Sequence, residues 1–103
     1  MRVIGRVVEQ GSGRPLQGLL VRAYDKDWIF DDKLGDTRTD ADGRFEIAYS
    51  EEQFRDLEET LPDLYLRVYD GTGKKLLFSS EKAVRRNALV TERYDIEIPR
   101  AKP

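Results

Sequence analysis

The chain of 103 residues contains no cysteine and no histidine. Without cysteine there can be no disulfide, no thiol nucleophile and no cysteine-ligated zinc or iron–sulfur site. Without histidine the chain lacks the commonest general base, the commonest transition-metal ligand and the usual pH switch. These two absences exclude much of enzyme chemistry before any pattern in the sequence is considered.

A strong charge of one sign is also lacking. The 18 basic and 20 acidic residues give a net charge of −2, so nucleic acid is not an expected partner. Charged residues nevertheless make up 37% of the chain, against ~25% in an average domain, which predicts a densely charged surface.

Long apolar runs are missing as well. No stretch approaches the ~18 residues of a membrane span. The first ten residues, MRVIGRVVEQ, hold no apolar stretch of the kind a signal peptide needs, so we expect no signal peptide, and the compartment stays open.

The length fits one domain. We expect a single domain over residues 1–98, followed by a charged, proline-bearing tail or linker over residues 99–103.

Apolar and polar residues alternate along most of the chain. This period of two predicts strands at residues 3–8, 19–25, 44–49, 64–69, 75–79 and 93–98, and about seven strands in all. Charge at every second position indicates that one face of each strand is wet. The pattern favours an all-β, seven-stranded Greek-key β-sandwich.

One segment departs from this period. Ser50 and Gln53 form a capping box, Phe54, Leu57 and Leu61 follow at helical spacing, and Pro62 ends the element. The segment predicts a short helix near residues 51–59, packed on one end of the sandwich.

Several segments together resemble the transthyretin-like (prealbumin-like) sandwich domains, which include the carboxypeptidase regulatory-like modules. The opening residues 3–8, the turn at residues 13–18 and the segment Thr39-Asp40-Ala41-Asp42-Gly43-Arg44-Phe45 carry the resemblance. The middle of the chain, residues 25–35 and 62–66, is similar to secreted nematode members and to modules attached to bacterial secreted proteins and toxins. The resemblance implies the sandwich fold and a secreted or surface-associated setting.

The enzymes of this and related folds are disfavoured by residues that the chain lacks. The 5-hydroxyisourate hydrolases use histidines and end in Tyr-Arg-Gly-Ser, whereas this chain ends its last strand with Ile98-Pro99-Arg100. The intradiol dioxygenases need two histidines for iron. The pilin-type isopeptide needs a lysine in the first strand, which is absent here.

An acidic loop is the first candidate site. Four carboxylates fall within eight residues, and oxygen ligands of this kind suit Ca²⁺. The candidate metal ligands are Asp25, Asp27, Asp31 and Asp32. The alternative is that these aspartates serve as turn residues and keep this end soluble.

Two aromatic sets are candidate partner-binding residues. Trp28 and Phe30 lie among the acids of this loop, where they either anchor a partner or plug the open end of the sandwich. Tyr24, Tyr65 and Tyr69 lie on predicted wet faces beside Arg22 and Arg67. If the strands at 19–25 and 64–69 are neighbours, these tyrosines form either a dimer or ligand face or an ordinary cross-strand ladder.

No catalytic residue is expected, because every acid falls in a polar turn, on a wet strand position or on the predicted helix surface. We therefore expect a non-enzymatic binding module without a cofactor, Ca²⁺ apart, whose partner is another protein, a parent chain or a second copy. The alternative is a structural spacer of a larger secreted or toxin-type bacterial protein.

Overall fold

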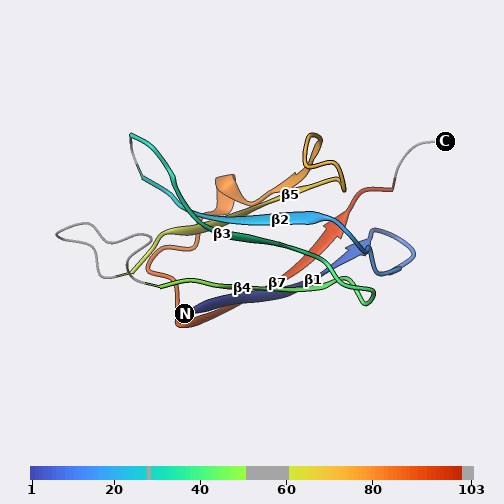
Figure 1. Ribbon diagram of the computed structural model, residues 1–103, viewed down its shortest axis with the longest axis horizontal. Coiled ribbons are helices and arrows are strands. Elements are labelled where there is room, and N and C mark those ends of the chain that lie inside the picture. The colour runs from blue at the N-terminus through green and yellow to red at the C-terminus, as the bar shows by residue number, and fades with distance from the viewer. Residues whose placement is uncertain (28, 51–60, 101–103) are drawn as a thin grey trace.

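The computed structural model describes residues 1–27, 29–50 and 61–100, and within them seven strands form two sheets (Figure 1). The elements in chain order are β1 (Arg2–Glu9), β2 (Leu20–Asp25), β3 (Asp32–Arg38), β4 (Arg44–Ala48), β5 (Leu64–Tyr69), β6 (Leu76–Ser79), the short 3-10 helix η2 (Glu81–Ala83) and β7 (Thr91–Ile98). The expected all-β, seven-stranded sandwich is confirmed.

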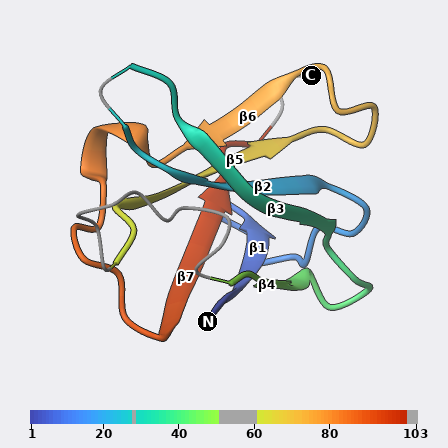
Figure 2. The same ribbon diagram turned by 60° about the vertical axis from the view of Figure 1, so that its left-hand side comes forward.

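The two sheets differ by one strand. The smaller sheet has the order β4-β1-β7 and the larger has the order β3-β2-β5-β6 (Figure 2). Neighbouring strands are antiparallel except β1 and β7, which pair in parallel from Arg2–Thr91 to Glu9–Ile98. The first and last strands of the chain are therefore neighbours.

Alternation along each strand builds the core between the sheets. On β7, Tyr94, Ile96 and Ile98 are buried, while the residues Arg93, Asp95 and Glu97 between them are exposed. The same rule buries the apolar residues Val3, Val7, Val21, Ala23, Phe45, Ile47, Leu64, Leu66 and Val68. The sequence pattern of period two thus decides which side of β1, β2, β4, β5 and β7 faces the core.

A tight turn carries the chain from one sheet to the other between β3 and β4. The Asp40 carboxylate accepts hydrogen bonds from the amides of Asp42 and Arg44, both at 2.9 Å. Gly43 has a φ of +75°, and a Cβ there would come within 2.4 Å of the Val7 carbonyl oxygen. The Asp-Ala-Asp-Gly sequence is what this turn requires.

β3 was not among the six strand ranges that we placed from the sequence. Its sequence DKLGDTR carries one large apolar residue, Leu34, which is fully buried. β3 is an edge strand, so most of its side chains face solvent and its alternation is faint. The helix expected near residues 51–59 lies outside the described residues.

Candidate functional site at the β2–β3 loop

The loop between β2 and β3, residues 26–31, projects from one end of the sandwich (Figure 1). Two large apolar side chains at its tip face solvent: Ile29 is 75% exposed and Phe30 is 80% exposed. Trp28, the other candidate anchor, lies outside the described residues. Phe30 does not plug the open end of the sandwich, because most of its surface is in water.

Hydrogen bonds to the backbone of Asp63 hold the first half of this loop. The buried carboxylate of Asp25, 2% exposed, accepts from the amide of Asp63 at 2.8 Å. The amide of Lys26 donates to the carbonyl oxygen of Asp63 at 2.7 Å. Asp63 itself accepts from the Arg86 guanidinium at 3.0 Å and from the amide of Asn87 at 3.1 Å. The loop is thereby tied to the segments before β5 and before β7.

Asp31 holds the second half of the β2–β3 loop in place. Its carboxylate accepts from the Tyr65 hydroxyl and, at 3.1 Å, from the amide of Asp27, and it lies 3.6 Å from the Lys26 ammonium. Burial opposes the charged form, but these donors outweigh it and hold the pKa of Asp31 below its ordinary value. Burial and the Asp31 carboxylate raise the pKa of the Tyr65 hydroxyl, which therefore stays a donor.

Glu81, in η2, joins the loop to β5. Its carboxylate bridges Lys26 at 2.8 Å and Arg67 at 2.5 Å. The hydrogen bond from Lys26, followed by that from Arg67, lowers the pKa of Glu81. The loop base is thus a chain of alternating charges from Asp31 through Lys26 and Glu81 to Arg67.

Two of the candidate tyrosines, Tyr24 and Tyr65, pack beneath these charged side chains. β2 and β5 are neighbours, as the tyrosine hypothesis required, and Tyr24 lies opposite Tyr65 with the rings stacked at 5.1 Å. The Arg67 guanidinium lies over both rings, at 5.4 and 5.6 Å. Tyr65 is only 1% exposed, so the expectation that it lies on a wet face was wrong. Charged side chains around its ring and hydroxyl cover it, and its place is at the base of the loop.

Tyr69 lies farther along the same face. It is half-buried, and the Arg22 guanidinium lies 5.4 Å from its ring centre. Arg22 in turn faces Asp36 of β3 at 3.5 Å. These contacts are those of a cross-strand ladder between β2, β3 and β5.

The four aspartates proposed for calcium face different groups. Asp25 and Asp31 accept the hydrogen bonds described above. Asp27 is half-buried and donates its amide to Asp31, and Asp32 is exposed at the start of β3. Among the residues that the structure describes, no three acidic side chains gather closely enough to hold a metal ion. The geometry favours the turn and capping interpretation of these residues.

Two acids are buried, contrary to the expectation that every acid lies in a polar or wet position. Asp25 ends β2, and Glu92, 9% exposed, lies in β7. Glu92 accepts from the Arg85 guanidinium at 2.9 Å and from the amide of Leu89 at 2.7 Å. Both carboxylates tie loops to strands, which accounts for their burial without a catalytic role.

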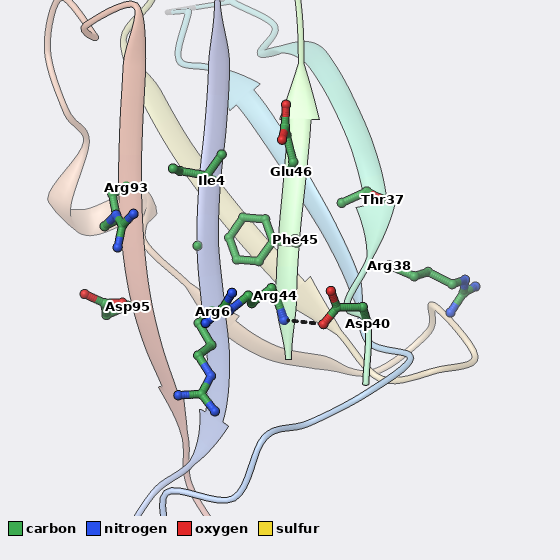
Figure 3. Close-up of a pocket in the computed structure, with 11 residues that line it drawn as sticks. Ile4, Arg6, Thr37, Arg38, Asp40, Arg44, Phe45, Glu46, Arg93 and Asp95 are labelled. Atoms are coloured by element: carbon green, nitrogen blue, oxygen red, sulfur yellow. Dashed lines mark hydrogen bonds between the residues drawn. The ribbon is translucent and has the colours of Figure 1, made fainter. Parts of the chain in front are cut away.

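A separate concavity lies on the outer face of the smaller sheet (Figure 3). This groove of about 800 Å³ is lined by charged side chains, among them Arg6, Arg44, Arg93 and Asp95. Arg6 and Arg44 lie directly opposite each other on β1 and β4. Within the described ranges neither forms an ion pair, although the Arg6 Nε donates to the carbonyl oxygen of Asp42 at 2.9 Å.

Asp63 and Glu81 are the site residues that the sequence did not indicate. Each follows a turn residue, Pro62 or Ser80, and each looks like one more surface acid in a chain that is 37% charged. Their importance depends on which segments lie beside the loop, and no local pattern reports that.

The fold and this loop define a small all-β sandwich domain with a loop at one end, whose base is held by hydrogen bonds and ion pairs and which exposes Ile29 and Phe30. The Transthyretin-like family matches residues 11–99, and the chain belongs to that family. The resemblance inferred from the sequence is confirmed.

A comparison with curated proteins found no match. Among solved structures, the chain is similar to a 9R-lipoxygenase from Cyanothece PCC8801, with a TM-score of 0.67 and 24% identity. The match covers 96% of this chain and 16% of the lipoxygenase chain, so the similarity is one of fold to a small part of a larger protein.

No helix in the described part of the chain is long and apolar enough to cross a membrane.

Proposed function

We propose that this protein is a non-enzymatic interaction module that binds another protein through the tip of the β2–β3 loop. The observation that carries the proposal is the contrast between the tip and the base of this loop. Ile29 and Phe30 are largely exposed, whereas Asp25, Lys26 and Asp31 at the base of the loop are held by hydrogen bonds and ion pairs to three other segments.

This contrast suits recognition for a physical reason. Exposed apolar side chains gain free energy when a partner covers them, and aromatic residues are common anchors in interfaces. A loop whose base is already held in place loses less conformational entropy on binding than a loop without such contacts. The ion pairs at the base supply that order without occupying the tip.

The alternative function is a structural accessory domain of a larger protein. The observation that favours it is the solved relative, in which a similar fold makes up 16% of a lipoxygenase chain. In that setting the loop would contact another part of the parent protein. The secreted or surface-associated location implied by the resemblance belongs to the same proposal.

Site-directed photo-crosslinking tests the loop directly. A photo-reactive amino acid would replace Phe30 in one variant and Leu76 in a control variant, because Leu76 is also exposed but lies on β6. Expressed in the native host, the Phe30 variant should crosslink to one discrete protein or to its own parent chain, and the Leu76 variant should not.

The double variant Ile29→Ser with Phe30→Ser supplies the second arm. Its melting temperature should change little, because surface substitutions usually alter stability by no more than about 0.5 kcal/mol. Crosslinking from a neighbouring loop position should nevertheless be lost. Equal crosslinking from Phe30 and Leu76, or none from Phe30, would contradict the proposal.

A further inference from the structure

The smaller sheet leaves one of its long edges open. β7 pairs with β1 on one side, and no described residue pairs with its backbone as a strand on the other. The larger sheet has a fourth strand, β6, with no counterpart in the smaller sheet (Figure 2). An additional strand beside β7 would give both sheets four strands.

Hydrogen bonds at the two ends of β7 show which backbone groups face this edge. The carbonyl oxygens of Val90 and Ile98 accept from the amides of Arg2 and Gln10, both on the β1 side. Because the direction alternates along a strand, the amides and carbonyls of the odd-numbered residues point away from β1. An extended strand laid there would find donors and acceptors already aligned.

Arg85 covers the first half of this edge. Its guanidinium donates to the carbonyl oxygen of Arg93 at 2.7 Å, pairs with Glu92 and lies 3.7 Å from the ring centre of Tyr94. A side chain that blocks an edge in this way protects a sheet against unwanted pairing. The second half of β7, around Asp95 and Glu97, has no such cover among the described residues.

A groove of about 480 Å³ lies at this uncovered half. Phe78 of β6 and Ile96 of β7 contribute apolar surface, and Asp95 and Glu97 contribute negative charge. The groove also extends across β7 to Arg6, Val8 and Gln10 of β1, and Arg6 lies opposite Asp95 in the strand register. Neither carboxylate forms an ion pair within the part of the chain that is described. The open backbone edge of β7, the apolar side chain of Phe78 and the two carboxylates therefore lie close together, and Glu97 has the uncharged Val8 opposite it on β1.

The charges decide what kind of strand fits. A second copy that paired its own β7 antiparallel with residues 95–97 would place acid opposite acid, which is unfavourable. In the register that would place Arg93 opposite Asp95, the second copy would need the backbone carbonyl oxygen of Arg93 as an acceptor. That oxygen already accepts a hydrogen bond from Arg85. A strand with basic side chains on its outer face and an apolar side chain toward Phe78 has neither conflict.

We infer that the open half of β7 is a second binding surface, which adds an extended, basic segment of another polypeptide to the smaller sheet. Backbone hydrogen bonds to Asp95 and Glu97 supply the pairing, and their carboxylates select the basic partner. This surface lies at the end of the sandwich away from the β2–β3 loop, so it does not depend on the function proposed for that loop.

Amide exchange with model strands tests this inference. The probes are capped heptapeptides that alternate lysine with valine, glutamate with valine, or lysine with valine with every backbone amide N-methylated. At millimolar concentration the lysine–valine peptide should slow exchange of the Asp95 and Glu97 amides at least tenfold. The glutamate peptide should have no effect. The N-methylated peptide keeps the charge but loses its backbone donors, and it should also have no effect.

Charge reversal provides the matched variant. Asp95→Lys with Glu97→Lys should transfer protection of the same two amides from the lysine peptide to the glutamate peptide. The melting temperature of this variant reports whether it is folded, and the Ile29→Ser, Phe30→Ser variant should bind the lysine peptide like the wild type. Three outcomes would overturn the inference: no protection at β7, equal protection by all peptides, or dimerisation of the free protein through β7.

Discussion

Gly5 lies opposite Phe45 on neighbouring strands, and the Phe45 ring fills the space that a side chain at position 5 would need. A Cβ on Gly5 would come within 2.7 Å of the ring and within 2.2 Å of the Tyr94 carbonyl oxygen. Gly5 does not have a positive φ, so its backbone conformation would allow other residues. Glycine is required here because neighbouring atoms leave no space for a Cβ.

Gly5→Ala should therefore lower the free energy of unfolding by about 1–3 kcal/mol, the usual cost of overpacking a core. Urea denaturation measures it. Gly71→Ala is the matched control, because its Cβ would have its nearest neighbour at 3.6 Å, and it should cost much less. Equal losses in the two variants would show that the Phe45 contact does not matter.

The opposed arginines on the outer face of the smaller sheet predict a stabilising substitution. Arg44→Glu replaces a like-charge pair with Arg6 by an opposite-charge pair, and should raise the free energy of unfolding by about 0.2–1 kcal/mol. Arg44→Gln, which only removes the repulsion, should gain less. The gain of the glutamate variant should shrink in 1 M salt, because exposed charges are screened. A glutamate variant no more stable than the glutamine variant would contradict this account.

The lowered pKa of Glu81 predicts how the loop base responds to acid. The Lys26 and Arg67 contacts stabilise the folded state fully above the ordinary Glu pKa of 4.5, and that contribution is lost as pH falls through the lowered pKa. Wild-type protein should thus melt higher than Glu81→Gln at pH 7, and the two melting temperatures should converge in strong acid. Thermal melts across this pH range measure the difference. A gap that persists at the lowest pH would mean that the charge of Glu81 is not what matters.

Calcium should leave the melting temperature unchanged. The loop aspartates accept hydrogen bonds from the protein itself, and no three acids gather among the described residues. Melts in EDTA and in millimolar Ca²⁺, with Mg²⁺ as the control, test this directly. A site filled at 100 times its Kd would add ~2.7 kcal/mol, or roughly 10 °C or more for a domain of this size. A shift of that size with Ca²⁺ alone would restore the metal hypothesis.

The sequence predicted the parts of this fold that depend on local chemistry. Period-two alternation located six of the strands, because one face of each is buried against the other sheet. The Asp40–Gly43 turn could also be identified from the sequence, because the Asp40 carboxylate and Gly43 that form it lie within four residues. β3 escaped because an edge strand with one buried residue leaves little pattern.

The candidate site was predicted in outline. Its position in the loop at residues 25–32 followed from acids and aromatics found together, and the exposure of Phe30 fits an anchor. The burial of Tyr65 could not be foreseen, because its contacts include Lys26 and Asp31, which lie far from it in the sequence. Alternation assigns a side chain to a face of the sheet, but it does not report what other segments lay over that face.

The parallel pairing of β1 with β7 has a mechanical consequence. β1 begins at one end of the sandwich and β7 ends at the other, because the two strands run parallel along their whole length (Figure 1). A tension applied through the ends of the chain would pull these neighbouring strands in opposite directions along their common axis. The force would act in shear on all the hydrogen bonds between β1 and β7 at once, so these bonds could not break one after another. A module of this kind resists stretching along the line that joins its ends.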